Sequence, residues 1–191
     1  SIFRILSRLD PYYAGSCEID SHEVSSLSID NLRNQLGVIP QEPILFTGSV
    51  RNSIDPLDKY SDESICQALM YCGLAQTFGI RKQDHNCEKK LHELLDMHLV
   101  GAGSNISLGQ KQLLSLGRVF LRKSPIIMCD EITSSIDGHS RQLIYDALNK
   151  FHMENMCTLL IITHSLQEAR LVSDRVLTLQ DGKVLKIENI E

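Results

Sequence analysis

The chain has 191 residues, a net charge of −5 and 42% hydrophobic residues, which are the length and composition of one ordinary globular domain. These values exclude a disordered or fibrous chain. The chain also lacks the excess of basic residues expected of a nucleic-acid binder. No apolar run approaches the roughly 20 residues that a membrane-spanning helix needs.

The first part of the chain predicts short elements. Apolar residues at helical spacing predict a helix over residues 2–9, which an Asp-Pro pair ends. We expect a short strand at 17–20 and a short helix at 28–32. A buried strand follows at 37–40 and leads into a loop.

The middle of the chain, residues 50–123, has mostly helical apolar spacing. One helix is expected to begin at 62–64 and to end near Gly73. The charged and Gly-rich stretch at 79–105 predicts mostly loop, and a helix is possible within it at 88–98. Ser107 then opens a longer helix. Its expected buried face comprises Leu113, Leu114, Leu116, Val119 and Phe120.

The last part of the chain alternates strands with helices. Apolar runs at 126–129 and 158–163 predict two buried parallel strands, separated by a helix over 139–153. A short helix at 167–173 and a hairpin around the Asp-Gly pair at 181–182 complete the chain. Strands that alternate with helices predict an α/β fold with a parallel sheet at its centre.

The six cysteines are scattered along the chain and form no C-x-x-C pair. Several lie in apolar runs, where a cysteine behaves as a small hydrophobic residue. The pattern therefore predicts free thiols rather than a disulfide framework.

Polar residues stand at the ends of the two predicted strands: Asp130 and Glu131 after the first, His164 after the second. Neighbouring parallel strands end at one edge of a sheet, where such folds bind ligands. One carboxylate on Mg²⁺ and a second that orients a water is the arrangement that nucleotide hydrolysis needs. Taken singly, an acidic pair or a histidine is more often a solvated turn or a structural group.

A helix start supplies a further candidate, formed by Ser107, Gly109 and Gln110. The unpaired backbone N–H groups and the positive dipole end of a helix favour phosphate binding. The simpler interpretation is a serine-capped helix without a ligand. A zinc site at His92 and His98 is set aside, because six residues place them about 240° apart round a helix.

Five motifs, in order, resemble those of the ATP-binding-cassette (ABC) ATPases. The sequence Ser-Leu-Gly-Gln at 107–110 resembles their signature motif, and 126–131 resembles their Walker B strand. Residues 134–137 resemble the D-loop, His164 the switch histidine, and 38–46 the Q-loop.

The segment 46–56 is similar to the C-type, multidrug-resistance-associated transporters, and the large residue at 108 is a feature of their second cassette. The resemblance implies a P-loop NTPase fold in which residues 1–191 form part of a nucleotide-binding domain. Its α-helical subdomain would cover about 50–123, and its Walker B to C-terminal core about 124–191.

The phosphate loop G-x-x-x-x-G-K-[ST] is absent from these 191 residues. By resemblance, Ser1 aligns just past the lysine of that loop. We therefore expect that the N-terminal strands and the phosphate loop are missing from this chain.

The resemblance also implies residue roles, with ATP and Mg²⁺ as the bound groups. Glu131 would polarise the attacking water and His164 would contact the γ-phosphate, while Asp130 and Gln41 would hold the metal. The implied nucleotide-binding positions are Gln41, Ser107, Gly109, Gln110, Asp137 and Ser1.

The implied function is ATP binding and hydrolysis that drives transport across a membrane, at its cytoplasmic face. The partners would be the transporter's transmembrane domains and a second nucleotide-binding domain, whose ATP the signature faces; no nucleic acid is expected. Residues 1–191 alone are expected to be inactive, because the phosphate loop supplies most contacts to the β- and γ-phosphates. The alternatives are a soluble ABC ATPase of translation or DNA repair, which the acidic balance disfavours, and an inactive spliced product.

Overall fold

The computed structural model describes residues 2–11, 14–101 and 103–190. Its helices are α1 (Ile2–Leu6), the 3-10 turn η1 (Val24–Ser26), α2 (Ile29–Gln35), α3 (Val50–Ile54), α4 (Asp62–Tyr71), α5 (Leu74–Thr77), α6 (Cys87–Asp96), α7 (Leu108–Arg122), α8 (Gly138–Asn155) and α9 (Leu166–Val172). Its strands are β1 (Glu18–Ile19), β2 (His22–Glu23), β3 (Leu36–Ile39), β4 (Gly48–Ser49), β5 (His98–Leu99), β6 (Ile126–Asp130), β7 (Thr158–Ile162), β8 (Arg175–Gln180) and β9 (Lys183–Asn189).

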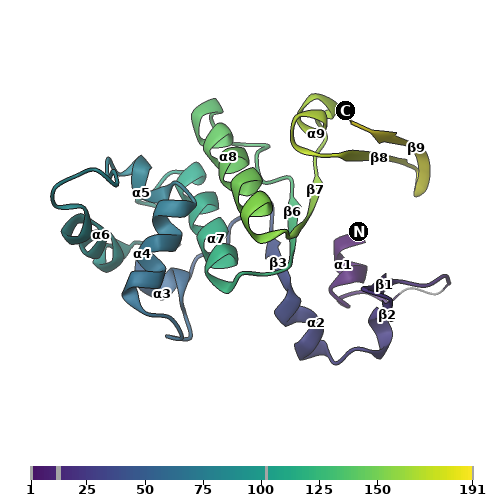
Figure 1. The fold of residues 1–191 in the computed structure, drawn as a ribbon, viewed down its shortest axis with the longest axis horizontal. Helices are drawn as coiled ribbons and strands as arrows, with labels where there is room; N and C mark the ends of the chain where they lie inside the picture. The colour runs from purple at the N-terminus through teal and green to yellow at the C-terminus, as the bar shows by residue number, and fades with distance from the viewer. Residues whose placement is uncertain (1, 12–13, 102, 191) are drawn as a thin grey trace.

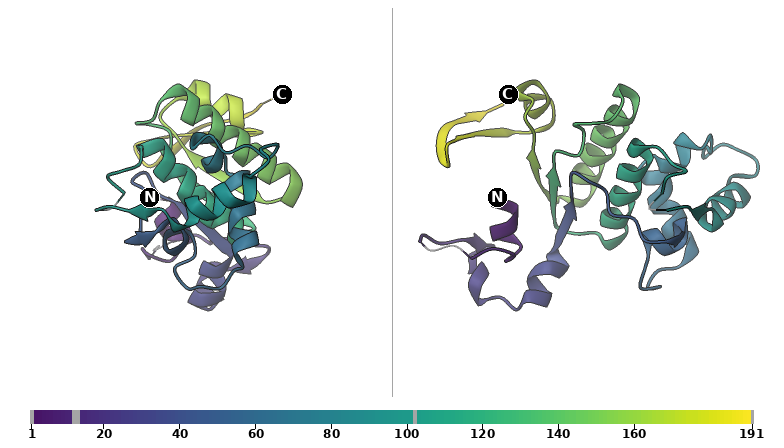
Figure 2. Two further views of the ribbon diagram at one scale, coloured as in Figure 1. Left: turned by 90° about the vertical axis from the view of Figure 1, so that its left-hand side faces the viewer. Right: turned by 180° about the vertical axis from the view of Figure 1, so that it is seen from behind.

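A parallel sheet with the strand order β3-β6-β7 lies at the centre of the molecule. Cys129 of β6 pairs with Ile39 of β3 on one side and with Ile161 of β7 on the other. The helices α7 and α8 lie on one side of these strands (Figure 1). The α1 segment and the β8–β9 hairpin lie on the other side, away from α3–α6 (Figure 2). The predicted α/β fold with a parallel core is confirmed.

Successive residues of β6 face opposite sides of the sheet, and each side has its own hydrophobic core. Ile127 and Cys129 belong to the larger core, which includes α7 and α8. Met128 packs into a smaller core with Phe3 and Leu32. Because both faces are covered, the strand is apolar at each position from Ile126 to Cys129 rather than at every second one.

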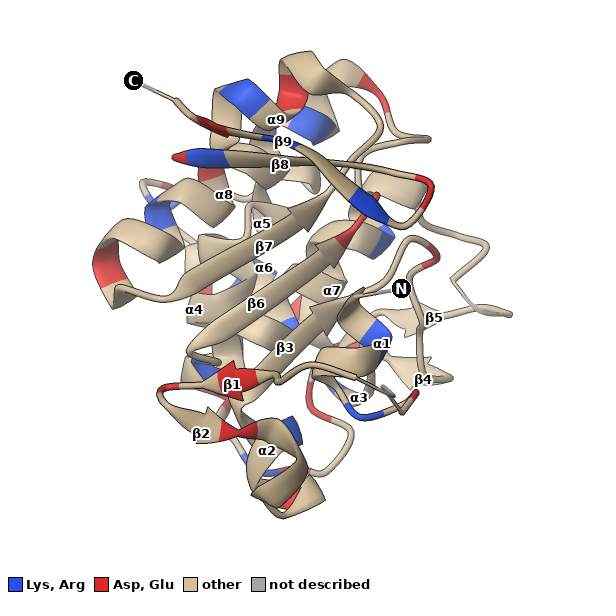
Figure 3. Ribbon diagram, turned by 90° about the vertical axis from the view of Figure 1, so that its right-hand side faces the viewer, with Lys and Arg blue, Asp and Glu red and all other residues tan. Residues whose placement is uncertain are grey.

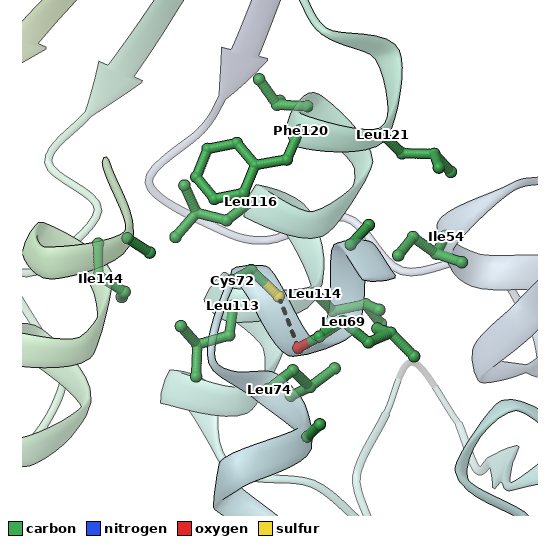
Figure 4. Close-up of a cluster of buried hydrophobic side chains, with 14 of the residues drawn as sticks. Ile54, Leu69, Cys72, Leu74, Leu113, Leu114, Leu116, Phe120, Leu121 and Ile144 are labelled. Atoms are coloured by element: carbon green, nitrogen blue, oxygen red, sulfur yellow. Dashed lines mark hydrogen bonds between the residues drawn. The ribbon is translucent and has the colours of Figure 1, made fainter. Parts of the chain in front are cut away.

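The larger core is centred on α7. The five residues predicted for its buried face are all buried there, and Figure 4 shows Leu113, Leu116 and Phe120 among them. The ring of Phe120 stacks on that of Phe151 from α8, with 4.3 Å between the ring centroids. Cys72 lies in the same core, where burial raises the pKa of its thiol to about 12. As predicted, all six cysteines are free.

Helix α7 approaches the sheet closely at Gly37 of β3. A Cβ at this position would lie 2.5 Å from Cγ1 of Val119 and 3.0 Å from Cβ of Ser124. Since a β-branched valine has little freedom to move aside, the close packing of α7 on β3 requires glycine at position 37.

The first helix is shorter than the apolar spacing predicts. It ends at Leu6 rather than at residue 9, where the hydroxyl of Ser7 donates to the carbonyl of Phe3 at 2.7 Å. Arg8 then takes a positive φ of 51°. The chain turns back, and Asp10 forms an ion pair with Arg4 at 2.6 Å. Local polar contacts thus replace the helical turn that spacing alone predicts.

The predicted hairpin is present as the antiparallel pair β8–β9. Its turn residues Asp181 and Gly182 have φ values of 50° and 73°. Two successive positive values are what a two-residue hairpin turn of the primed type requires. Among the residues that the structure describes, no helix has both the length and the apolarity needed to cross a bilayer.

Candidate functional site

Two predicted side chains meet at the carboxyl edge of the sheet. Glu131 follows β6, His164 follows β7, and Oε1 of the glutamate lies 2.7 Å from Nε2 of the histidine. The side chain of Glu131 is 20% exposed and that of His164 is 86% exposed. The carboxylate is therefore set into the sheet edge, while the imidazole projects into solvent. The acidic end of β6 is drawn red in Figure 3.

The backbone of Glu131 is held in an uncommon conformation. Its φ is 50°, in the left-handed region that non-glycine residues rarely adopt. The N–H of Glu131 donates to the carbonyl of Ile162 at 3.0 Å, and its own carbonyl accepts the hydroxyl of Ser134 at 3.0 Å. One bond to β7 and one within its own turn hold this strained backbone in place and so fix where the side chain starts.

The loop after β3 brings a third predicted residue to this edge. Nε2 of Gln41 donates to Oε2 of Glu131 over a long 3.4 Å. Asp130, the last residue of β6, is half-buried and pairs with Ile162 of β7. The structure therefore brings together Gln41, Glu131 and His164, with Asp130 beside them along the strand.

The donor atoms at this edge suit a magnesium ion. Asp130 supplies carboxylate oxygens, and Gln41 supplies an amide oxygen on its exposed side chain. Mg²⁺ prefers such oxygen donors and is usually held by one or two carboxylates together with phosphate oxygens of the substrate. The residues present thus fit the protein's share of such a site.

The start of α7 forms a capping box. The hydroxyl of Ser107 accepts the N–H of Gln110 at 3.1 Å, and Oε1 of Gln110 accepts the N–H of Ser107 at 2.9 Å. Nε2 of Gln110 also donates to the hydroxyl of Thr77 at 3.2 Å. The expected helix start is confirmed, and in this structure both ends of the glutamine amide hold it in place.

The start of α7 contacts the start of α8 at Gly109. A Cβ on Gly109 would lie 2.4 Å from Oγ and 2.6 Å from Cβ of Ser140. Asp137 caps α8, because its Oδ1 accepts the N–H of Ser140 at 2.9 Å. This bond is the main cause that lowers the pKa of Asp137, so its carboxylate stays charged at neutral pH. Ser107, Gly109, Gln110 and Asp137 thus form a second group, and Ser1 lies outside the described residues.

Sequence reasoning missed two residues of α7 that hold the loop carrying Gln41. Gln112 is 1% exposed, and its Nε2 donates to the carbonyls of Gln41 at 2.8 Å and Pro40 at 3.3 Å. The guanidinium of Arg118 donates to the carbonyl of Ile44 farther along the same loop. Burial lowers the pKa of Arg118 to about 10.

A signal for Gln112 was present in the sequence. It stands four residues before Leu116, on the face of α7 predicted to be buried. A buried amide needs hydrogen-bond partners, so its position indicated a polar contact. The sequence did not reveal which segment would supply the partner.

Comparison with known proteins identifies relatives over nearly the whole chain. A family model described as "ABC transporter" matches residues 1–134. The human ATP-binding cassette sub-family C member 2 is 37% identical over 186 residues, which are 97% of this chain and 11% of the relative. The Arabidopsis thaliana ABC transporter C family member 9 is 34% identical over 189 residues, 99% of this chain and 12% of the relative. The chain thus spans 11–12% of the length of these curated relatives.

The fold also has a similar solved structure. It matches that of a bacterial Atm1-family ABC exporter with ATP bound, with a TM-score of 0.83 and 23% identity. The match covers 98% of this chain and 31% of the other.

The contact between Gly109 and Ser140 predicts the effect of adding one methyl group. Gly109→Ala should destabilise residues 1–191 by about 1–3 kcal/mol, because the new methyl overlaps a buried side chain. Urea unfolding followed by circular dichroism measures the loss. Gly138→Ala, at a position with no atom within 4 Å of a Cβ, is the control and should not destabilise the chain.

A double-mutant cycle separates the overlap from other effects of the alanine. Ser140→Gly keeps the backbone N–H that Asp137 accepts but removes the overlapping atoms. The penalty of Gly109→Ala should therefore shrink in the Ser140→Gly background. An equal penalty in both backgrounds would show that the two helices do not meet at this point.

Proposed function

This chain belongs to the ABC transporter family, with relatives in subfamily C, and we propose that it is the motor domain of such a transporter, coupling ATP hydrolysis to transport of a substrate across a membrane. Its α/β fold is that of the P-loop NTPases. The observation that supports the proposal best is the contact between Glu131 and His164 at the carboxyl edge of the parallel sheet. Ligands bind at this edge in folds of this class.

In the proposed mechanism, Glu131 is the general base. Its Oε1 is paired with His164 and its Oε2 faces the amide of Gln41, so both carboxylate oxygens have fixed directions. The carboxylate orients the attacking water and accepts its proton, a role that typically contributes about 10²- to 10⁴-fold in rate. His164 is exposed enough to exchange its carboxylate partner for the γ-phosphate, to which Nε2 donates.

Asp130 and Gln41 are the residues that would hold Mg²⁺. When bound, the ion neutralises charge on the β- and γ-phosphates of ATP. Gln112 and Arg118 fix the backbone of the loop that carries Gln41, so they set the position from which its side chain reaches the site.

The second group of residues serves a partner in this proposal. Ser107 is exposed at the start of a helix of 15 residues, and the exposed Asp137 lies beside it. Ser107, Gly109 and Gln110, at the positive end of the α7 dipole, would face the ATP held by a second nucleotide-binding domain. The partners are thus that domain and the transporter's transmembrane domains, at the cytoplasmic face of the membrane. Residues about 50–123 would form the helical subdomain, and about 124–191 the core.

The role of Glu131 as general base can be tested in the full-length transporter. Glu131→Gln should lower ATP hydrolysis at least about 100-fold, because an amide cannot accept the proton, while ATP binding persists. Phosphate release and nucleotide binding are measured on the same preparation. Glu93→Gln, an exposed glutamate on α6, is the matched control and should hydrolyse ATP like the unaltered protein. Rapid hydrolysis by Glu131→Gln would overturn the assignment.

The effect of the missing phosphate loop can be tested on residues 1–191 as an isolated chain. Because they contain no phosphate loop, they should bind ATP weakly and hydrolyse none, although Asp130, Glu131 and His164 are present. Calorimetric titration with ATP and Mg²⁺ measures the affinity. A micromolar dissociation constant would contradict the prediction.

A further inference from the structure

We propose that Glu168 is a positioning residue that fixes Glu131 and His164 relative to one another, an inference that rests on the proposed hydrolytic role of this pair. Glu168 lies in the first turn of α9, four residues beyond His164. Its side chain is only 17% exposed. The hydroxyl of Ser165 accepts the N–H of Glu168 at 3.2 Å, so the turn that carries it is itself capped.

One carboxylate oxygen of Glu168 accepts three hydroxyl contacts. They come from Thr133 at 3.1 Å, Tyr145 at 2.9 Å and Thr163 at 3.3 Å. The other oxygen forms an ion pair with Arg141 at 3.1 Å. These partners lie on the turn after β6, on the residue after β7 and on α8, so Glu168 of α9 joins these three elements.

Two of these partners are chain neighbours of the proposed reacting pair. Thr133 is two residues beyond Glu131, and Thr163 immediately precedes His164. The carboxylate of Glu168 therefore ties the turn after Glu131 to the backbone next to His164. Since Glu131 and His164 meet at only 2.7 Å, a shift of either segment would alter their contact.

The hydroxyl groups around position 168 are well matched to a carboxylate, which accepts hydrogen bonds and donates none. The hydroxyls of Thr133 and Tyr145 lie 3.0 Å apart, and both are within 3.1 Å of the Glu168 oxygen. Each hydroxyl has one proton, and an ionised carboxylate can accept both at once because it donates none of its own. Burial, as the largest cause, raises the pKa of Tyr145 to about 12, so its proton stays in place. Hydrogen bonds to an ionised acceptor are also the stronger ones.

The ion pair between Glu168 and Arg141 also connects α9 to the start of α8. Arg141 stands four residues after Asp137, the cap of that helix, and its Nη2 reaches toward the carbonyl of Ile136 at 3.5 Å. A displacement of Glu168 would thus shift the start of α8, where Asp137 lies. We propose above that Asp137 faces a second nucleotide-binding domain. Glu168 accordingly couples the position of the reacting pair to the partner-facing end of α8.

The test uses the full-length transporter and separates positioning from folding. Glu168→Gln keeps the shape of the side chain but removes its charge, and Thr163→Val removes one hydroxyl at nearly constant volume. Both should lower kcat for ATP, the first by about tenfold or more, because small misplacements of reacting groups are costly. KM for ATP should change by less than about twofold, since the ground-state contacts with nucleotide are left in place.

The matched control is Glu188→Gln in β9. Glu188 is 18% exposed and forms ion pairs with Arg170 at 3.1 Å and Lys186 at 2.7 Å, so its burial and pairing resemble those of Glu168. This variant should leave kcat and KM unchanged. If Glu168→Gln and Thr163→Val behave like Glu188→Gln, the inference is overturned.

Two further measurements make every outcome decisive. A fall in kcat that matches the loss of folded protein in a thermal melt would show a structural role alone and would also overturn the inference. If Glu168→Gln does not accumulate as folded protein, Thr163→Val and Thr133→Val provide the test. Glu131→Gln, assayed in parallel, separates this inference from the proposed function. Retained hydrolysis in that variant refutes the function itself, whereas its loss beside normal Glu168 variants refutes the positioning role only.

Discussion

The strands β6 and β7 pair in parallel from Ile126 opposite Thr158 to Asp130 opposite Ile162. This register brings Glu131 and His164 out at the same edge, and the bond from the N–H of Glu131 to the carbonyl of Ile162 continues the pairing one step beyond the strand. The 2.7 Å contact between the two side chains follows from it. A register shift by one residue would turn every side chain of β7 to the opposite face and separate the pair.

The helix α7 positions the remaining groups around this edge. It packs on β3 through Gly37 and meets α8 through Gly109, and both approaches leave no room for a Cβ. Its side chains Gln112 and Arg118 hold the loop that carries Gln41. One rigid helix therefore connects its own start, the start of α8 and the loop at the sheet edge, which are the places where the proposed functional residues lie.

Local patterns predicted most of the fold. The apolar runs of β6 and β7, the serine cap of α7, its buried face and the Asp-Gly turn are each encoded within a few residues, and all are confirmed. The strand ends also predicted that Glu131 and His164 would lie on one edge. The predicted length of α1 was wrong, because Arg8 takes a positive φ of 51° and the N–H of Leu9 bonds to the carbonyl of Arg4 instead of continuing the helix.

The supporting contacts could not be predicted from the sequence. Gln112 and the carbonyl of Gln41 are 71 residues apart, and Thr133 and Glu168 are 35 apart. No periodicity specifies such pairs, because they depend on how distant elements come together.

A double-mutant cycle on ATP hydrolysis by the full-length transporter tests most directly whether Glu131 and His164 act as a unit. The rates of Glu131→Gln, His164→Ala and the double variant are compared with that of the unaltered protein. Residues that act together give strongly non-additive losses, so the double variant should be no slower than the slower single variant. If the two losses multiply, the pair does not act as a unit and the account of the site is contradicted.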